Sequence, residues 1–147
     1  MESFSKQMND IIKKTKNNTR KAVAAGCLDI TKEIIQRTPV DTGRLKGNWI
    51  PDINNIPDYS LDTYDKSGNK AISKASSETN KIQIGDIYFL INNLVYAPVA
   101  EYGLYPIPGG EKTINGYSTQ APAGMVRTTV EEADYLIQKA VKIHGDT

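Results

Sequence analysis

The side chains that could carry nucleophilic chemistry are few in this chain. It holds one cysteine, Cys27, and one histidine, His144, among 147 residues. A Ser/His/Asp or Cys/His arrangement would need His144, which falls at the end of an expected helix near the C-terminus, where chains fray. Cys27 falls on an apolar helical stripe, where cysteine behaves as a small hydrophobe. We therefore expect no catalytic residue and no enzyme, and a hydrolase that uses Cys27 or His144 is the least favoured alternative.

Metal, phosphate and disulfide chemistry are also disfavoured. A single cysteine cannot form an internal disulfide, and one cysteine with one histidine excludes zinc sites of the Cys/His type. The run Gly109-Gly110-Glu111-Lys112 lacks the spacing of a phosphate-binding loop. Carboxylates such as Asp41 and Glu101 show no spacing that would make them converge. We predict no cofactor and no metal site.

A basic cluster offers a different kind of chemistry. It consists of Lys13, Lys14, Lys16, Arg20 and Lys21 and has no interleaved aromatic residues. Binding of nucleic acid is one interpretation, and a solvated face or a contact between subunits is the favoured one.

Charge is distributed unevenly along the chain. Residues 1–50 hold ten Lys/Arg and five Asp/Glu, a balance of +5, whereas residues 51–147 hold eight and twelve, a balance of −4. These sum to the net charge of +1. Such polarity could align subunits head to tail, and solvated faces of differing charge explain it equally well.

A long helix must carry the basic cluster. Apolar residues recur at three- and four-residue steps over residues 3–37, which predicts one amphipathic α-helix with Ser3 or Ser5 as its cap. At about 1.5 Å per residue it would approach 50 Å, so we expect part of it to pack on a neighbouring subunit. Two shorter helices folded back, with a break at the weak helix formers of residues 17–19, are the alternative. Pro39 should end the element at Thr38.

The middle of the chain has the character of strands and loops. Leu45 and Trp49 lie at even spacing, so residues 44–56 predict a strand and then a loop, with Trp49 as a core anchor. Residues 57–81 indicate a surface loop that contains a short helix over 69–79. Residues 82–93 predict a β-hairpin that turns at Gly85-Asp86.

The last third predicts a short helix, a loop and a final helix. Residues 94–103 suit a helical turn that starts at Pro98 and closes at Gly103. Residues 104–120 form a long loop with Tyr105 and Tyr117 as exposed contact residues. A second apolar stripe follows over residues 125–143. We predict a single α+β domain over 1–147: an N-terminal helix (1–38), a small antiparallel sheet with long loops (39–120), and a C-terminal helix (121–147) packed on the sheet.

Three segments in this order resemble one family. Residues 38–49, Thr-Pro-Val-Asp-Thr-Gly-Arg-Leu-Lys-Gly-Asn-Trp, resemble the "TPVDTGR…NW" signature of tailed-bacteriophage neck and tail-completion proteins. Residues 91–103 are similar to its "INNxxYA…ExG", and residues 118–127 to its "SxQAPAGMVR". Together these motifs span most of the chain. Residues 57–81 and 104–117 depart from a minimal member, and such insertions are where partner specificity would be placed.

The resemblance implies a structural virion protein of the phage neck. It implies a ring of identical subunits that joins the DNA-filled head to the tail, and ring closure demands sixfold or twelvefold symmetry at that location. The partners would be a head-closure or portal-side neck protein on one face and the tail terminator or tail tube on the other. DNA would pass through the lumen without sequence-specific binding. The alternatives are a tail terminator that caps the tube and a DNA-binding head–tail adaptor.

The expected location is the virion, after assembly in the host bacterial cytoplasm. The N-terminus lacks an apolar signal-peptide core, and no apolar run reaches membrane-spanning length, so we expect no membrane partner.

The residues that we expect at interfaces come from the basic cluster, the motifs and the loop tips. Arg44 could pair with a carboxylate, for which Glu101 and Asp41 are the candidates, and Glu101 is expected to bond the backbone or a partner arginine. Arg127 opens the last helix, the wrong end for a cation, which indicates a specific partner. The interface candidates are Lys13, Lys14, Arg20, Lys21, Arg44, Glu101, Tyr105, Tyr117 and Arg127.

Overall fold

The long amphipathic pattern forms one unbroken helix in the computed structural model, which describes residues 3–145. Helix α1 runs over Phe4–Arg37, and the weak helix formers of residues 17–19 lie inside it without a break. The Ser3 hydroxyl caps its start by accepting a hydrogen bond from the Lys6 N–H at 3.2 Å. Thr38 caps its end in an extended conformation. The alternative of two helices folded back is therefore wrong.

A short helix replaces the first part of the predicted strand after α1. Helix α2 covers Arg44–Gly47, and strand β1 begins only at Ile50 and runs over Ile50–Ile53. The spacing of four between Leu45 and Trp49 fits a helical turn as well as alternate positions on a strand, so it did not discriminate between them. The expected strand over residues 44–49 was wrong for that reason.

Strand β1 pairs with a segment far along the chain. It lies antiparallel to β2 (Tyr88–Ile91), with Ile50 opposite Ile91. The predicted hairpin at residues 82–91 does not form, because residues before β2 make turns in which the Asp86 carboxylate accepts the Gln83 N–H at 2.8 Å. A second small sheet pairs β3 (Thr113–Ile114) with β4 (Tyr117–Ser118) in the 104–120 loop.

The helices predicted inside the loops are present. Helix α3 covers Asn69–Thr79, with Ala71 and Ala75 buried. Helix α4 covers Ala97–Tyr102, with Pro98 in its first turn and Gly103 closing it in the left-handed conformation. Local turn chemistry was sufficient to predict both.

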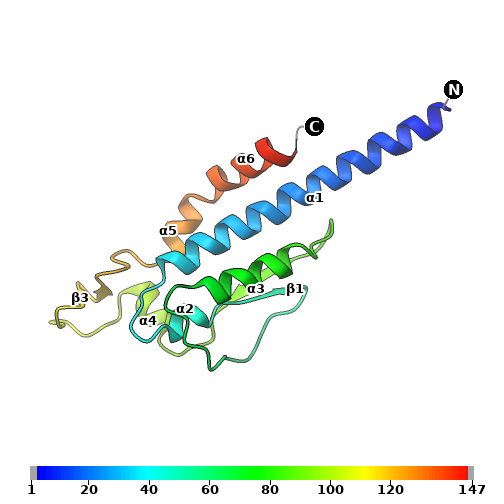
Figure 1. Cartoon of the computed structure of the whole chain (residues 1–147). Helices are drawn as coiled ribbons and strands as arrows, with labels where there is room; N and C mark the ends of the chain where they lie inside the picture. The colour runs from blue at the N-terminus through cyan, green and yellow to red at the C-terminus, as the bar shows by residue number, and fades with distance from the viewer. Residues whose placement is uncertain (1–2, 146–147) are drawn as a thin grey trace.

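The C-terminal stripe forms two helices in succession. Helix α5 covers Val126–Glu131 and α6 covers Ala133–His144. In Figure 1, α5 and α6 lie along one side of α1, and α3 with the β1–β2 sheet lies along the other. The predicted α+β class with a long N-terminal helix and a small antiparallel sheet is confirmed. The direct partner of α6 is α1, however, and not the sheet.

Small residues explain the contact between α1 and α6. A Cβ built at Gly26 would lie 3.8 Å from the Cβ of Ala140 and 3.8 Å from Cγ1 of Ile137, so the two helices approach closely at this glycine. At the other end of the contact, Arg37 donates from Nη1 to Thr129 Oγ1 at 3.0 Å and from Nη2 to Glu132 Oε1 at 2.8 Å. These bonds tie the end of α1 to α5.

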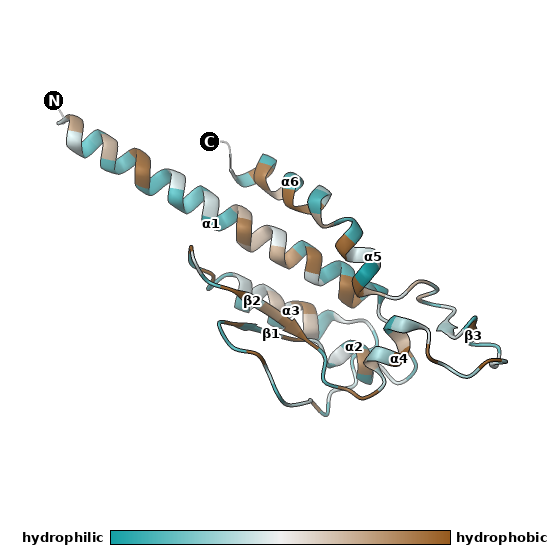
Figure 2. Ribbon diagram, turned by 180° about the vertical axis from the view of Figure 1, so that it is seen from behind, coloured by the Kyte–Doolittle hydropathy of each residue, from teal (hydrophilic) through white to brown (hydrophobic). Residues whose placement is uncertain are grey.

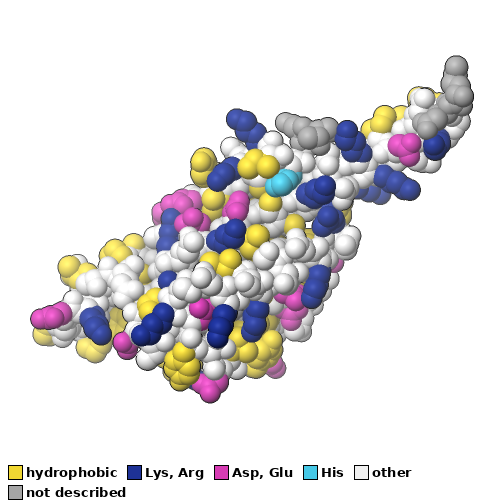
Figure 3. Space-filling model, viewed as in Figure 1, with side chains coloured by type: hydrophobic (Ala, Val, Ile, Leu, Met, Phe, Trp, Pro, Cys, Tyr) yellow, Lys and Arg dark blue, Asp and Glu magenta, His cyan; other side chains and the backbone are white. Residues whose placement is uncertain are grey.

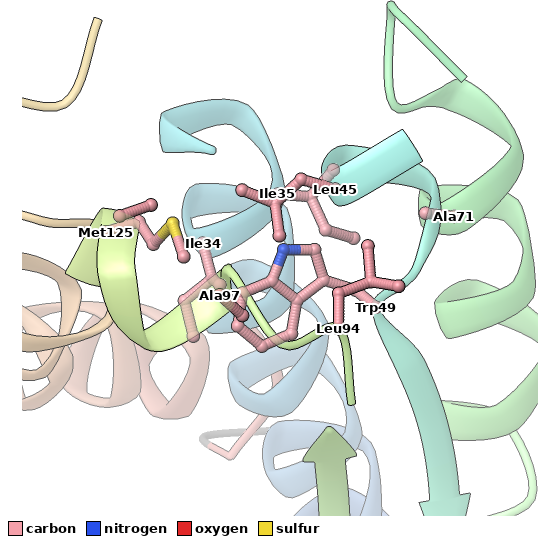
Figure 4. Close-up of a cluster of buried hydrophobic side chains, with 9 residues drawn as sticks. Ile34, Ile35, Leu45, Trp49, Ala71, Leu94, Ala97 and Met125 are labelled. Carbon is pink, nitrogen blue, oxygen red and sulfur yellow. The ribbon is translucent and has the colours of Figure 1, made fainter. Parts of the chain in front are cut away.

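The core surrounds the single tryptophan, as expected. Trp49 is 5 % exposed, and Figure 4 shows it among side chains from α1, α2 and the segments around α4. Its indole Nε1 donates to Thr38 Oγ1 at 2.8 Å, and Thr38 Oγ1 donates to the Ile34 carbonyl at 2.7 Å. The end of α1 is thus bonded to the core. The buried cluster comprises Ile34, Ile35, Leu45, Trp49, Ala71, Leu94, Ala97, Ala100 and Met125.

The first half of α1 projects from this body. Every residue from 3 to 17 is exposed, and Figures 1 and 2 show these turns extending beyond all the other elements. We call residues 3–17 the arm. Within residues 3–145, no helix has the length and apolar character that crossing a membrane requires.

Candidate interaction site

The three sequence segments that carry the family resemblance meet in space. The Gln120 side chain bonds to the backbone of Val40, accepting from its N–H at 2.9 Å and donating to its carbonyl at 2.8 Å. Asn92 donates from Nδ2 to the Leu45 carbonyl at 2.9 Å. We call residues 38–45, which follow α1, the hinge. The second and third segments are therefore each joined to the hinge by a side-chain amide that bonds to its backbone.

Glu101 joins the second segment to the third. Glu101 lies on α4, and 6 % of its surface is exposed. Oε2 accepts the backbone N–H groups of Met125 and Val126, both at 2.8 Å, and Oε1 accepts the N–H of Arg127 at 2.9 Å. These are the first N–H groups of α5, which lack partners inside their own helix. A glutamate distant in sequence thus caps α5 and complements its dipole.

The pKa of Glu101 reflects this arrangement. Burial by itself raises the pKa of the carboxyl, but the N–H donors of Val126, Arg127 and Met125 and the Arg127 side chain outweigh burial. The pKa of Glu101 consequently lies below its ordinary value, and the group is held as a carboxylate.

Arg127 is the partner arginine that the sequence suggested for Glu101. Its Nε donates to Glu101 Oε1 at 3.1 Å, and its Nη2 donates to the Glu101 carbonyl and to the Tyr117 hydroxyl. The guanidinium carbon lies 5.0 Å from the centre of the Tyr102 ring. Tyr102 is 57 % exposed, whereas Tyr96 packs against the core.

Gly124 shows how closely the second and third segments approach. Its φ is +87°, and an added Cβ would lie 2.7 Å from the Glu101 carbonyl oxygen and 3.0 Å from its Oε2. Only glycine combines this backbone conformation with this space. Glu101, Tyr117 and Arg127 are therefore brought together, in a cluster that joins α4 to α5, and their contacts are within the subunit.

Arg44 lies in a separate place and lacks the partner that we expected. Glu101 is engaged by Arg127, and Asp41 lies 3.7 Å from Lys112, with both side chains exposed. Arg44 instead lines a cavity of about 490 Å³ that continues past Tyr64, Tyr96 and Tyr105. We call this cavity the Arg44 pocket. Tyr105, predicted as an exposed loop tip, is half-buried and packs against the core at this pocket.

Sequence reasoning missed Tyr64 and Lys112, which also line the pocket. Tyr64 comes from the 57–68 loop and Lys112 from the 104–117 loop. Both lie outside the three motifs, and separations of this size leave no periodic signal. The same holds for buried Asp65, whose carboxylate accepts the N–H groups of Gly68, Lys70 and Ala71 at the start of α3.

The four basic candidates lie together on α1, away from both sites. Lys13 and Lys14 are on the exposed arm, and Arg20 and Lys21 follow it, with Arg20 half-buried. Figure 3 shows basic side chains along the projecting part of α1, beside hydrophobic ones. The exposed hydrophobic residues of the arm are Phe4 (76 %), Met8 (41 %), Ile11 (58 %) and Ile12 (45 %).

The two residues considered for catalysis have no activating surroundings that the structure shows. Burial raises the pKa of the Cys27 thiol, the direction opposite to that of an activated nucleophile. His144 is the last residue of α6. Within residues 3–145, no group of three or more His, Cys, Asp or Glu side chains is placed to hold a metal ion.

Comparison with known proteins adds no relationship to this description. No family model, curated protein or solved structure matches the chain.

Proposed function

We propose that this chain is a structural virion protein of the tailed-bacteriophage neck, whose ring joins the DNA-filled head to the tail. In this proposal identical subunits close a sixfold or twelvefold ring. One face binds a head-closure or portal-side protein, the other binds the tail terminator or tail tube, and DNA passes through the lumen. The protein is assembled in the bacterial cytoplasm and resides in the virion. The proposal rests on the three motifs for the identity of the assembly and on the arm for the need to assemble.

The arm is the single observation that supports assembly most directly. It is a helical segment that carries Phe4, Met8, Ile11 and Ile12 at exposed positions, and each of its residues from 3 to 17 is exposed. The arm continues the packed part of α1, so its helix needs no new nucleus, but its exposed apolar side chains gain stability only if they are covered. A neighbouring subunit in a ring supplies that cover, and contacts of one patch with a different patch generate rings when the rotation closes.

The interlocked motifs support a second requirement of the proposal. A neck subunit transmits force between head and tail, so its elements must keep their relative orientation. The Gln120–Val40, Asn92–Leu45 and Glu101–Arg127 bonds join the hinge, α4 and α5 into one unit that fixes where the arm leaves the body.

The apolar face of the arm provides the test. The double variant Ile11→Gln/Ile12→Gln removes apolar side chains without adding charge, and we expect it to fold normally but to leave the neck ring incomplete. The matched control is Asn9→Gln/Asn17→Gln, which changes two exposed polar residues of the same arm. Phage particles that carry each variant in place of the wild-type chain are counted by electron microscopy as joined or separate heads and tails. Normal joining with the isoleucine variant would contradict a role of the arm in assembly.

The identity of the assembly has its own test. Particles made without this protein should be DNA-filled heads and separate tails that fail to join, and infectious particles made without it would refute the neck proposal. Unstable or over-long tail tubes would favour the alternative of a tail terminator. Cryo-electron microscopy of the virion neck would give the order of the ring and both partners.

The exposed basic side chains of the arm favour one second candidate, a DNA-binding adaptor. Such a protein would release condensed cations from DNA, so its affinity would fall steeply with salt. The Lys13→Gln/Lys14→Gln variant should then lose DNA affinity, measured by fluorescence anisotropy between 50 and 200 mM salt, the range over which this effect is about 10³-fold or more for a protein with many phosphate contacts. Salt-insensitive or absent binding by the wild-type protein removes this candidate.

A further inference from the structure

Arg44 is a cation to which the described part of the chain, residues 3–145, supplies no partner. It is the first residue of α2 and is half-buried, and among the residues that the structure describes its Nε is the one buried side-chain nitrogen or oxygen without a hydrogen-bond partner. No ion pair or side-chain hydrogen bond of its guanidinium to a described residue is present. An arginine stays charged and carries five N–H donors. A buried donor without an acceptor is destabilising and calls for an explanation.

The pocket in front of Arg44 is built to admit a ligand. Its volume of about 490 Å³ is within the range of small-molecule sites. Tyr64, Tyr96 and Tyr105 contribute aromatic surfaces, and Leu45 contributes an apolar one. Tyr96 and Tyr105 pack against the hydrophobic core, so they are held in place behind the pocket.

The charged and amide side chains of the lining that could accept from Arg44 are engaged elsewhere. The carboxylate of Asp41 lies beside Lys112 and is 85 % exposed. The amide of Gln120 uses both its oxygen and its nitrogen on the backbone of Val40. The charged side chains of the lining are Arg44, Lys112 and Asp41, so the lining carries a net charge of +1. The missing component is an anionic acceptor from outside the subunit.

We propose that the Arg44 pocket binds an acidic peptide segment of another protein chain, whose Asp or Glu carboxylate accepts hydrogen bonds from Arg44. The two terminal nitrogens of a guanidinium match the two oxygens of a carboxylate in a bidentate pair, and such a pair does not require access to the buried Nε. An apolar residue next to the acid would lie on the tyrosine rings. One net positive charge and aromatic walls suit a singly charged peptide side chain better than a doubly charged phosphate. This site goes beyond the neck proposal and holds whether or not the chain forms a ring.

The test uses two blocked peptides that differ in one functional group. Acetyl-Phe-Glu-Phe-amide and acetyl-Phe-Gln-Phe-amide are titrated into the full-length protein, and binding is followed by the Nε–Hε signals of arginine in ¹⁵N–¹H NMR spectra. The signal of Arg44 is assigned by its loss in Arg44→Lys. We expect the Glu peptide to shift this signal saturably and to bind at least about tenfold more tightly than the Gln peptide, because hydrogen bonds from a guanidinium to a charged acceptor are stronger than those to a neutral one.

Variants separate recognition by Arg44 from attraction by charge alone. Arg44→Lys keeps the charge but removes the two terminal nitrogens of the guanidinium, and we expect it to bind the Glu peptide at least about tenfold more weakly. Lys112→Gln removes an exposed charge of the same lining and should change the affinity less than threefold. Equal binding of both peptides, or full affinity in Arg44→Lys, overturns the proposal. So does inorganic phosphate that shifts the Arg44 signal when the Glu peptide does not, since the site would then be a phosphate site.

Folding is monitored separately, because Arg44 follows a critical turn. Arg44→Met has a similar length and no polar group, and the native guanidinium makes no bond that would be lost. We expect Arg44→Met to unfold at the wild-type temperature or above it while losing the peptide. A marked loss of thermal stability in Arg44→Met would show that the arginine serves the fold, and the proposal would fail.

Discussion

Glu101 caps the N-terminal end of α5, although it lies far from that helix in the sequence. Its carboxylate meets the free N–H groups of α5 from another part of the chain, at 2.8–2.9 Å, and also holds Arg127. We expect Glu101→Gln to lower the free energy of unfolding by about 2–3 kcal/mol, because hydrogen bonds to a charged acceptor are each worth about 1.5–3 kcal/mol. Urea unfolding followed by the fluorescence of the single tryptophan, Trp49, measures the difference.

The difference in stability between wild-type protein and Glu101→Gln should become smaller as the pH falls. The folded-state pKa of Glu101 is lowered, so its contribution to stability is present above the unfolded-state pKa, about 4.3, and is lost as the pH falls through the folded-state value. The stability gap between wild-type protein and Glu101→Gln should therefore be full at pH 7 and narrow below about pH 4. The exposed Glu111→Gln should stay within about 0.5 kcal/mol of wild type throughout. A gap that widens in acid would contradict the role of the carboxylate.

At the scale of elements, the hinge between α1 and α2 depends on Gly43. Its φ is +88°, and a Cβ added there would lie 2.6 Å from the Lys66 N and 2.7 Å from the Asp65 carbonyl carbon. The Gly43 carbonyl also accepts the N–H of Asp65 at 3.0 Å. Since the Asp65 carboxylate caps α3, this one glycine fixes the positions of α1, α2 and α3 relative to each other.

Three alanine variants separate the reasons for glycine. Gly110 has open space and no positive φ, Gly85 has open space but a φ of +96°, and Gly43 has both a positive φ and a blocked Cβ position. We expect Gly110→Ala to be within about 0.5 kcal/mol of wild type, Gly85→Ala to cost about 1–2 kcal/mol, and Gly43→Ala to cost about 3 kcal/mol or more. Thermal unfolding gives all three. If Gly43→Ala lowered the free energy of unfolding no more than Gly85→Ala does, close packing at the hinge would not contribute to stability.

For the whole molecule, we expect head–tail joining to depend more on the direction of the arm than on Cys27 or His144. Pro39→Ala loosens the end of α1, and Gly43→Val disrupts the hinge that aims the helix. We expect both to reduce head–tail joining in complementation tests more than Cys27→Ser or His144→Ala do, because neither Cys27 nor His144 lies at the hinge. Soluble, folded protein is confirmed for each variant by circular dichroism. Joining that survives the hinge variants but fails with the Cys27 or His144 variants would instead point to chemistry at those residues.

Features that depend on neighbouring residues could be predicted from the sequence. Pro39 ends α1, Pro98 and Gly103 bound α4, and the apolar spacing of residues 69–79 predicts α3, because steric limits and helical periodicity act over a few residues. The burial of Trp49 followed from its size and apolar character. These features were enough to predict the α+β class with a long N-terminal helix.

Features that join distant segments were decided by the tertiary structure. The spacing of Leu45 and Trp49 fits helix and strand alike, and the Gly43 turn with its contact to Asp65 accompanies the helical outcome. Strand β2 pairs with β1 and not with its neighbour, and Arg127, not Arg44, holds Glu101, because such pairings depend on which surfaces the core brings together. The sequence by itself therefore determined the helices that local signals bound, α1, α3 and α4, whereas packing decided α2, the pairing of the strands and the partners of the charged side chains, and left Arg44 facing an open pocket.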